Sequence, residues 1–426
     1  MSKYYFLAIV YLFSVVSSSI ANSIDADVQN IYRIPFLNVR WIDIAILIIL
    51  ISFFYNLFLI VRRLKNTGFI ILLCFIYIIF ESFQLYRTWG LIDAASQMSH
   101  FLCTVSLFIV IDLSTYVLLI DSIILFLKRL AIWSAIAIII SNLYLLYSFL
   151  SGHVTYTDSD IRVGLEVAGS KEFVSSWVLT PFVYAFGLYF IQKSGRFWEK
   201  LLFLIAIFSI YGALVITYFR GTLVMLLIIT IYFIFSSSNA KQSLLKMGGL
   251  LLFIVLGYLF FGGVLTKKGY DPVKKVVEIV EFTTDTENPD WDKGRSFSQE
   301  YAIEAWQKNP LIGAGYNDLS NYGLPDNMAT AHNGVITSLF HRGIIGTFIL
   351  MLILILLFKY AIVLWFVLRR QTTFQSDMIK LLILVSVLWI ITFLTQEILW
   401  EKYSLSIEYM YLGLILNCYK QYNIKS

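Results

Sequence analysis

Long apolar runs alternate with short polar connections along most of the 426 residues. A helix crosses the hydrocarbon core of a bilayer with about 20 apolar residues, and the usual range is about 17–25. The runs that approach or reach this length are Tyr4–Ile20, Trp41–Val61, Gly68–Leu85, Phe101–Ile120, Leu130–Leu150, Phe173–Ile191, Leu201–Phe219, Gly221–Phe235, Met247–Leu265, Ile344–Leu368, Ile379–Thr395 and Leu405–Tyr419. The pattern predicts an all-α polytopic membrane protein, with about twelve transmembrane helices in a single integral membrane domain, residues 1–426.

Basic residues mark every second connection between these runs. The positive-inside rule assigns such loops to the cytoplasm, and the marked positions include Lys3, Arg129, Arg196, Lys246, Arg370 and Lys425. We therefore expect both termini in the cytoplasm. A large, partly helical loop between spans nine and ten, residues 266–331, should then lie on the external side.

The first apolar run allows two interpretations. Ser19-Ile20-Ala21 at its end resembles a signal-peptidase site. However, the segment before the run has a single lysine and the run contains tyrosines, which is unlike a typical signal peptide. These features favour a first helix that is retained.

The polar stretch from Gly294 to Gly346 contains most of the groups that can act chemically in water. Within it, Ser296 to Gln299 has the S-x-x-Q spacing of a capping box, which predicts that a helix begins there. Arg295 would then lie at a helix N-terminus, where free backbone N–H groups favour an anion. The helix should end before Pro310, because proline disfavours helical geometry in the residue before it.

The rest of the large loop is expected to be partly ordered. Asp271-Pro272 followed by valines at helical spacing up to Val280 predicts a short amphipathic helix. Asp and Glu outnumber Lys and Arg between residues 266 and 331, so the loop is not a basic platform for anionic lipids. Gly313-Ala314-Gly315 has no βαβ context, and we interpret it as a turn and not as a nucleotide site.

Composition supports the membrane class. Hydrophobic residues make up 59% of the chain and charged residues 14%, whereas soluble domains are roughly 45–50% apolar. The net charge of +5 is explained by the topology signals, so we expect no nucleic-acid partner. The three cysteines lie in apolar runs and indicate neither a disulfide framework nor a metal site.

Two arginines stand out. Arg220 lies between two apolar runs, where it is either an interfacial arginine that extends to the headgroups or a cation held for an anionic ligand. Arg162 lies in the loop formed by residues 151–172, and by its position alone it is an ordinary solvated residue.

The four histidines differ in context. His100 and His153 lie at span ends, and His341 is in an apolar helix where its neighbours should satisfy it. His332 stands beside Asn333 at the expected cap of the next apolar helix, where a neutral imidazole can accept a proton. No metal-ligand spacing accompanies it, so we expect neither a metal site nor a cofactor.

Acidic residues inside the apolar runs are a further signal. They are Glu81, Asp112, Asp121 and Glu397. A charge in lipid is costly, so at least one of them should face the interior of the bundle. The sequence does not say which one does so.

Together these motifs resemble the external loop of the bacterial O-antigen ligase and O-antigen polymerase superfamily. The pattern is Gly294-Arg295, Trp306, Asn309-Pro310-Leu311, Gly313-x-Gly315, His332-Asn333 and Gly343-x-x-Gly346. Phe219-Arg220-Gly221 is similar to the Ser-Arg-Gly signature of the family but has Phe219 in place of the serine. Arg162-x-Gly164 resembles the family pattern before the sixth span, and the twelve-span layout matches as well.

The resemblance implies a metal-independent glycosyltransferase of the GT-C type in the bacterial inner membrane, with its active site facing the periplasm. Its donor would be an oligosaccharide on undecaprenyl diphosphate, and its acceptor a glycan or lipid A-core. Membrane lipids and a chain-length regulator protein are further partners that it implies.

The resemblance also suggests roles for residues. Arg220 and Arg295 would stabilise the diphosphate leaving group, and His332 would take the proton of the acceptor hydroxyl, with inversion at the anomeric carbon. Arg162, Asn333, Gly313 and Gly315 would contribute to substrate binding.

Three functions remain open. A polymerase joins repeat units on undecaprenyl diphosphate, and a ligase passes the glycan to lipid A-core. The composition, rich in Ile, Phe, Tyr, Asn and Lys, is typical of an AT-rich, serotype-like gene and slightly favours the polymerase. A polysaccharide flippase or other transporter is disfavoured, because the motif residues concentrate in one external loop and not at the bilayer midplane.

Overall fold

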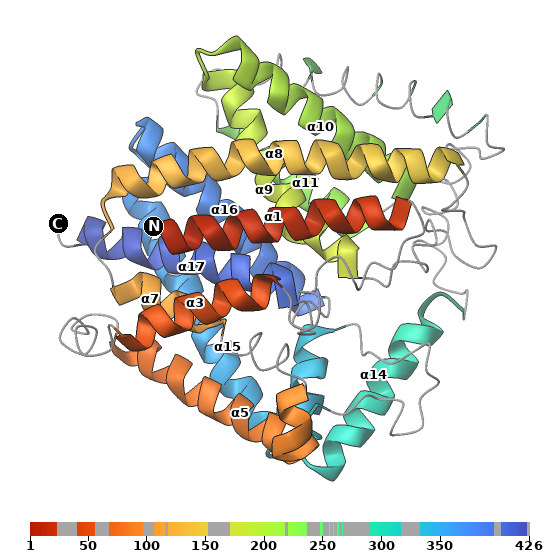
Figure 1. Ribbon diagram of the computed structural model, residues 1–426, viewed down its shortest axis with the longest axis vertical. Coiled ribbons are helices and arrows are strands. Elements are labelled where there is room, and N and C mark those ends of the chain that lie inside the picture. Colours follow the sequence, from red (N-terminus) through yellow and green to blue (C-terminus); the bar gives the residue numbers. More distant parts are fainter. Residues whose placement is uncertain are drawn as a thin grey trace. The chain divides into compact units, whose positions relative to one another are not determined.

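In the part of the chain that the structure describes, all secondary structure is helical. The computed structural model describes residues 1–23, 41–55, 68–96, 106–115, 118–151, 171–217, 220–236, 290–316, 333–395 and 402–423, and isolated positions between 248 and 266. Within these residues there are twelve helices and no strand (Figure 1). The fold class is therefore confirmed as all-α.

All of the helices except the polar helix α14 overlap the predicted apolar runs. They are α1 (Ser2–Ser23), α3 (Trp41–Tyr55), α5 (Gly68–Ser96), α7 (Phe108–Thr115), α8 (Ile120–Ser151), α9 (Lys171–Lys193), α10 (Phe197–Thr217), α11 (Arg220–Phe235), α14 (Asp290–Lys308), α15 (Gly334–Leu368), α16 (Phe374–Thr395) and α17 (Lys402–Asn423). The predicted span Met247–Leu265 and the predicted helix at Asp271 to Val280 lie largely or wholly outside the described residues.

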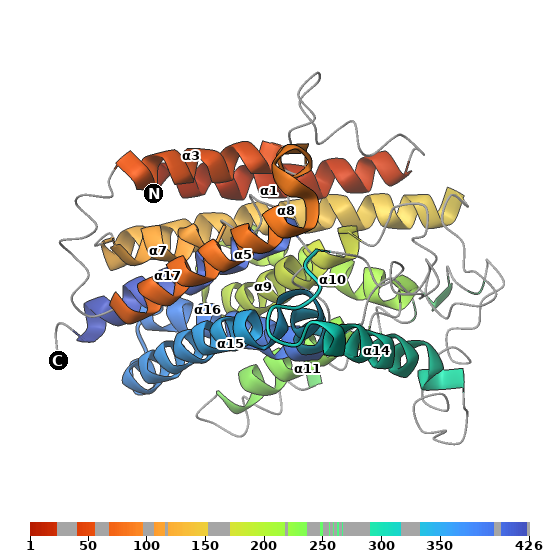
Figure 2. The ribbon, with the colours of Figure 1, turned by 90° about the horizontal axis from the view of Figure 1, so that it is seen from below.

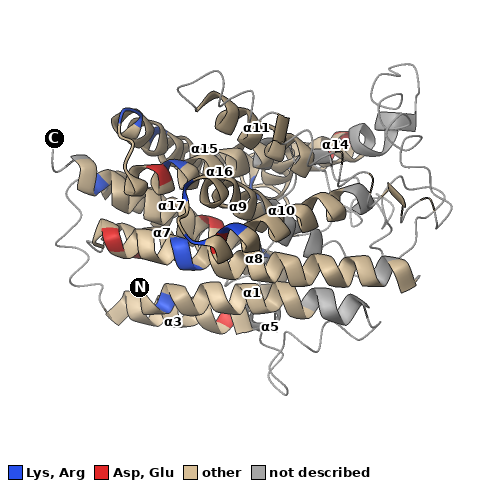
Figure 3. Cartoon of the chain, turned by 90° about the horizontal axis from the view of Figure 1, so that it is seen from above, with Lys and Arg blue, Asp and Glu red and all other residues tan. Residues whose placement is uncertain are grey.

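Several helices have the length and composition of membrane spans. Among the described residues, five meet both requirements: Gly68–Gly90, Ile120–Tyr147, Phe197–Leu214, Gly334–Leu368 and Phe374–Thr392. Charged side chains are sparse on the described helices, which are mostly tan in Figure 3. The chain is thus a multi-pass membrane protein, while the full set of twelve spans and the side on which the loop lies stay predictions.

One predicted connection is wrong. We expected Arg129 in a loop before the run that starts at Leu130, but α8 begins at Ile120 and runs through both Lys128 and Arg129. The side of the membrane on which these residues lie stays a prediction. The side chain of Lys128 has a partner there, because its Nζ lies 2.9 Å from a carboxylate oxygen of Glu199 on α10. This ion pair allows a cation to remain within a largely apolar helix.

The predicted start of α14 is also wrong. The helix begins at Asp290, so Ser296 to Gln299 and Arg295 lie inside it and not at its N-terminus. Asp290 and Asp292 stand in the first turn of the observed helix. Acidic residues are favoured there because the N-terminal end of the helix dipole is positive. The predicted end is confirmed, since α14 stops at Lys308, just before Asn309-Pro310.

The chain divides into two compact units. The first comprises residues 1–8, 38–125 and 289–426, and the second comprises residues 9–37 and 126–288. In the first unit α15 contacts α5, α14, α16 and α17, and α17 also packs on α7 (Figure 2). In the second unit α9 packs on α10 and α11. The first unit therefore has α15 as its central helix.

A buried ion pair ties the start of α1 into the first unit. The side chain of Asp112 on α7 is fully buried. Its Oδ2 lies 2.6 Å from Lys3 Nζ and also accepts a hydrogen bond from the Tyr4 hydroxyl. Lys3 donates further to Ser52 Oγ of α3 at 3.0 Å. The expectation that an intramembrane acid faces the interior is confirmed for Asp112.

We predict that Lys3→Ala destabilises the protein by roughly 3 kcal/mol, because it leaves a buried carboxylate without its cation. The double variant Lys3→Leu with Asp112→Leu should recover most of this loss, because no charge is then left unpaired. The measurement is thermal unfolding of the purified protein in detergent. Arg370→Ala, at an exposed position, is the control and should unfold like the wild type; equal losses in all three variants would contradict the prediction.

Candidate functional site

The polar loop returns to the bundle at the start of α15. Asn333 is the N-cap of this helix, and its Oδ1 accepts hydrogen bonds from the backbone N–H groups of Val335 at 3.0 Å and Ile336 at 3.1 Å. The predicted cap at this position is confirmed. The cap satisfies two of the N–H groups that every helix start leaves without an intrahelical partner.

A break divides α15 into a short first piece and a long second piece. Gly343 has φ 62° and ψ −167°, which is not helical. This region of backbone conformation is accessible essentially to glycine alone. Residues 334–342 therefore form a separate helical piece before the long apolar segment that ends at Leu368.

The turn after α14 is built by local hydrogen bonds. Trp306 Nε1 donates to the carbonyl of Pro310 at 3.0 Å, and the N–H of Gly313 donates to the carbonyl of Asn309 at 2.8 Å. Gly313 and Gly315 have φ values of 72° and 78°. Both glycines thus occupy conformations that other residues rarely adopt. The turn itself covers residues 310–312 and is closed by Gly313, just before the predicted position Gly313-Ala314-Gly315.

This turn and the break in α15 bind each other through their backbones. Four backbone N–H groups donate to carbonyl oxygens of the other segment: Ala314 to Phe340 at 2.6 Å, Gly315 to His341 at 3.0 Å, Ile344 to Pro310 at 2.9 Å and Ile345 to Leu311 at 3.1 Å. The breaks in both segments free these groups from helical pairing, and each segment satisfies the other. We call residues 310–315 and 340–345 the glycine clasp.

The glycine clasp requires its glycines for steric reasons. A Cβ atom on Gly313 would stand 2.5 Å from the nitrogen of Gly343, and one on Gly343 would overlap the carbonyl of Leu311. Real Cβ atoms do not approach backbone so closely. Gly346 similarly faces the ring of Phe80 on α5, which a Cβ would overlap. The motif Gly343-x-x-Gly346 therefore has a packing role at both positions.

Helix α5 holds the glycine clasp from the other side. Arg87 donates to the carbonyl of Gly313 at 2.6 Å, and Gln84 Nε2 donates to the carbonyl of Ile312. Thr88 Oγ1 accepts the N–H of Tyr316 at 2.9 Å. Side chains from the C-terminal half of α5 thus occupy carbonyls and an N–H of the loop that the clasp leaves unpaired.

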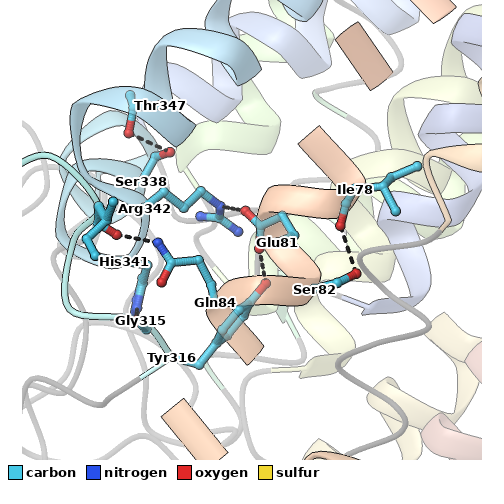
Figure 4. Close-up of polar contacts among 11 residues, drawn as sticks. Ile78, Glu81, Ser82, Gln84, Gly315, Tyr316, Ser338, His341, Arg342 and Thr347 are labelled. Atoms are coloured by element: carbon cyan, nitrogen blue, oxygen red, sulfur yellow. Dashed lines mark hydrogen bonds and ion pairs between the residues drawn. The ribbon is translucent and has the colours of Figure 1, made fainter. Parts of the chain in front are cut away.

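A buried polar network lies beneath these contacts (Figure 4). Glu81 on α5 accepts hydrogen bonds from Arg342 Nε at Oε1 and from the Tyr316 hydroxyl at Oε2. Glu81 is only 1% exposed and Arg342 7%. The interior-facing acid that we expected therefore includes Glu81.

His341 joins this network through its ring. Its Nδ1 lies 2.6 Å from the carbonyl oxygen of Gly315. A carbonyl can only accept, so Nδ1 carries the proton. The expectation that neighbours satisfy His341 is confirmed. The ring also stacks near Tyr316, with 6.1 Å between ring centroids, and Tyr316 packs on Trp89 at 5.4 Å.

The structure describes some of the predicted site residues and not others. Gly313 and Gly315 lie in the glycine clasp and Asn333 lies at the start of α15, and their described polar groups bond within the protein. Arg220 begins α11 in the second unit, and Arg295 lies within α14 in the first. His332 and Arg162 lie outside the described residues, as does Glu397. The roles proposed for these residues in substrate binding and catalysis stay predictions.

The sequence interpretation missed several residues that build this site. They are Gln84, Arg87, Tyr316 and Arg342. Arg342 directly follows His341 in an apolar helix, and an intramembrane Arg together with the intramembrane Glu81 was a detectable signal for a pair. Gln84 and Arg87 gave no such signal, because their partners are backbone carbonyls.

The polar side chains of the site are engaged in hydrogen bonds and in one ion pair. Among the described residues, no group of three or more His, Cys, Asp or Glu side chains is arranged to hold a metal ion.

Asp121 is exposed at the start of α8, where it accepts a hydrogen bond from Gln375 at 2.5 Å.

These features define a multi-pass helical membrane protein in which a polar loop is fastened to the bundle beside a capped helix start. Residues 201–351 match the family model described as O-antigen ligase. The match covers about a third of the chain and supports the resemblance to the O-antigen ligase and polymerase superfamily and, in broad terms, a function of this type. The matched region contains Arg220, Arg295 and His332 but not Arg162. The comparison with curated proteins found no match.

We predict that Gly343→Ala destabilises the protein far more than Gly90→Ala. Both glycines have φ and ψ values from the same glycine-only region, which costs another residue about 1–3 kcal/mol. A Cβ on Gly90 meets nothing within 4 Å, whereas one on Gly343 meets the backbone of Leu311, and such overpacking costs about 1–3 kcal/mol more. Thermal unfolding of both purified variants measures the difference; equal shifts would show that the glycine clasp does not constrain the fold.

Proposed function

We propose that the protein is a metal-independent glycosyltransferase that transfers an undecaprenyl-diphosphate-linked oligosaccharide to an acceptor glycan at the periplasmic face of the inner membrane. The observation that carries this proposal is the family match over residues 201–351. The capped start of α15 directly after His332 supports it. Within this proposal a polymerase is the first candidate, because the composition of the chain slightly favours it.

The leaving group determines what the protein must supply. Breaking the bond between the anomeric carbon and the diphosphate oxygen leaves negative charge on the diphosphate, which preorganised cationic donors can stabilise. Arginine offers a planar fork that binds two phosphate oxygens. Arg220 is the first residue of α11, where the N–H groups of the first turn add a favourable field for an anion. For Arg295, inside α14, only the guanidinium supports this role.

The acceptor side requires a base. The attacking sugar hydroxyl loses its proton as the new glycosidic bond forms, and His332 accepts it in this proposal. Attack from the face opposite the diphosphate inverts the anomeric carbon without a covalent intermediate. Asn333 fixes the backbone directly after His332, because its side chain caps α15.

A second candidate is an O-antigen ligase that transfers the glycan to lipid A-core, because the matching family model carries that description. The lipopolysaccharide ladder of a deletion strain distinguishes the two. A core capped by one repeat unit identifies a polymerase, and loss of all O-antigen identifies a ligase. An unchanged ladder would contradict both and favour another glycan pathway.

We predict that Arg220→Ala and Arg295→Ala each abolish transfer while the protein level in the membrane stays unchanged. Lysine at either position should rescue only partly, because a point charge lacks the bidentate geometry. The wild-type rate should persist in EDTA, because the arginines take the place of a divalent ion. A glycan-transfer assay with purified protein measures all three; full activity of Arg220→Lys, or a rate that collapses in EDTA and returns with magnesium, would refute this part of the mechanism.

We predict that His332→Ala lowers the transfer rate by about 10²–10⁴-fold, the range typical of general acid–base catalysis. Donor binding should persist, because the phosphate contacts belong to the arginines. His332→Asn is the informative comparison, since asparagine keeps a polar, hydrogen-bonding side chain next to the cap Asn333 but cannot act as a base at neutral pH. The assay measures rate and donor affinity for both variants, and an active His332→Asn protein would assign His332 a structural role only.

A further inference from the structure

Basic side chains gather at one end of the second unit, around the connection between α9 and α10. They are Lys128 of α8, Lys193 at the end of α9, Arg196 just before α10 and Lys200 in the first turn of α10. We call these four residues the basic patch.

A buried carboxylate fixes two members of the basic patch. The side chain of Glu199 is only 2% exposed, and its Oε1 lies 2.9 Å from Lys128 Nζ and 3.6 Å from Arg196 Nη1. Glu199 Oε2 accepts a hydrogen bond from Ser194 Oγ at 2.5 Å, and Ser194 Oγ in turn accepts the N–H of Arg196 at 3.1 Å. These bonds hold the short connection between the two helices in one conformation.

Glu199 offsets only one of the four positive charges. In the described part of the second unit, the other acidic residue is Glu172, which lies at the opposite end of α9. Lys193 and Arg196 are exposed, and Lys200 is half-buried. The basic patch therefore presents an excess of positive charge that no described acid of its own unit balances.

Helix lengths place the basic patch at a boundary of the membrane. The apolar stretch Ile120–Tyr147 of α8 has 28 residues, which is about 42 Å of helix, whereas the hydrocarbon core is about 30 Å thick. About 20 residues, from Lys128 to Tyr147, are enough to cross the core. On α10 the candidate span begins at Phe197, directly after Arg196. The ion pair between Lys128 and Glu199 thus joins the two spans at the level where each one starts to cross.

Exposed aromatic side chains accompany the charges. Phe197 is 78% exposed and Trp198 48%, and both stand between Arg196 and Lys200 in the sequence. Tryptophan is enriched at the level of the lipid headgroups, where its ring has both apolar and polar neighbours. Anionic headgroups attract basic side chains at the same level. The combination fits a phosphate that is attached to a lipid.

We propose that the basic patch, together with Trp198, binds the phosphate headgroup of an anionic phospholipid. Lys193, Arg196 and Lys200 bind the phosphate, while Lys128 stays paired with Glu199. The bound lipid ties the connection between α9 and α10 to the membrane surface. Basic residues also direct the orientation of a chain during insertion. A lipid site differs from such a signal because it acts on the folded protein.

The test measures lipid binding by the purified full-length protein. Thermal unfolding in phosphatidylcholine micelles is followed as the fraction of phosphatidylglycerol rises, since a ligand of the folded state raises the melting temperature. The variant carries Lys193→Gln, Arg196→Gln and Lys200→Gln and keeps the pair of Lys128 with Glu199. Each basic residue near an anionic surface strengthens binding about five-fold. We therefore expect the triple variant to bind phosphatidylglycerol about 100-fold more weakly.

The chain offers a matched control in the first unit. Arg369 and Arg370 are an exposed basic pair at the end of α15, and the guanidinium of Arg369 lies 5.2 Å from the ring centroid of the exposed Phe366. The double variant Arg369→Gln with Arg370→Gln should keep the wild-type affinity for phosphatidylglycerol. A similar loss in both variants would overturn the inference, because net charge alone would then explain the binding.

Two further outcomes would contradict a lipid site. Inorganic phosphate at the same ionic strength should leave the melting temperature of the wild type unchanged, and a shift as large as that caused by phosphatidylglycerol would assign the patch to a soluble anion. If phosphatidylglycerol and phosphatidylcholine stabilise the wild type equally, the basic patch serves only as a topology signal. None of these measurements depends on glycan transfer, so their result leaves the proposed function untouched.

Discussion

The close approach of Gly313 and Gly343 is the constraint on which the described site depends. A Cβ on Gly313 would lie 2.5 Å from the nitrogen of Gly343, so the two backbones meet without side chains between them. Four reciprocal hydrogen bonds of the glycine clasp become possible only at this distance. Because the bonds use groups that the break in α15 releases from helical pairing, the break and the loop stabilise each other.

This constraint explains why polar side chains gather on α5. A loop that enters an apolar bundle carries carbonyl and N–H groups that lipid cannot satisfy. Gln84, Arg87 and Thr88 bind those that the glycine clasp does not use. Glu81 then balances the charge of Arg342 within the bundle. Gln84, Arg87 and Thr88 of α5 therefore bind polar backbone groups of the loop.

Much of the fold could be predicted from apolar run length alone. The expected starts of α3 at Trp41 and of α5 at Gly68 coincide with the structure. The end of α14 before Pro310 follows from the proline. Helix ends predicted from charge were less reliable. The basic pair at Lys128 and Arg129 marks a connection in the sequence, but α8 runs through it. Lys128 pairs there with Glu199, a tertiary contact that the sequence does not show. The capping-box pattern at Ser296 was misleading because the acidic turn at Asp290 starts the helix earlier.

The candidate site was predictable only in its local features. Asn333 has the chemistry of a cap, and Gly313 and Gly315 have that of a turn. The contacts of Arg87 and Gln84 were not predictable, since each joins residues more than two hundred positions apart through a backbone carbonyl. Side-chain identity does not encode such partners. Sequence motifs thus located the loop, whereas its attachment to α5 required the structure.

We propose that a loop fastened in this way serves glycosyl transfer from a lipid diphosphate. The most direct measurement uses purified protein in liposomes with an undecaprenyl-diphosphate-linked glycan, following released undecaprenyl diphosphate and the length of the acceptor glycan together. Under this proposal, each undecaprenyl diphosphate released accompanies one transferred glycan. Movement of the intact lipid-linked glycan across the bilayer without release of undecaprenyl diphosphate would contradict it and identify a transporter.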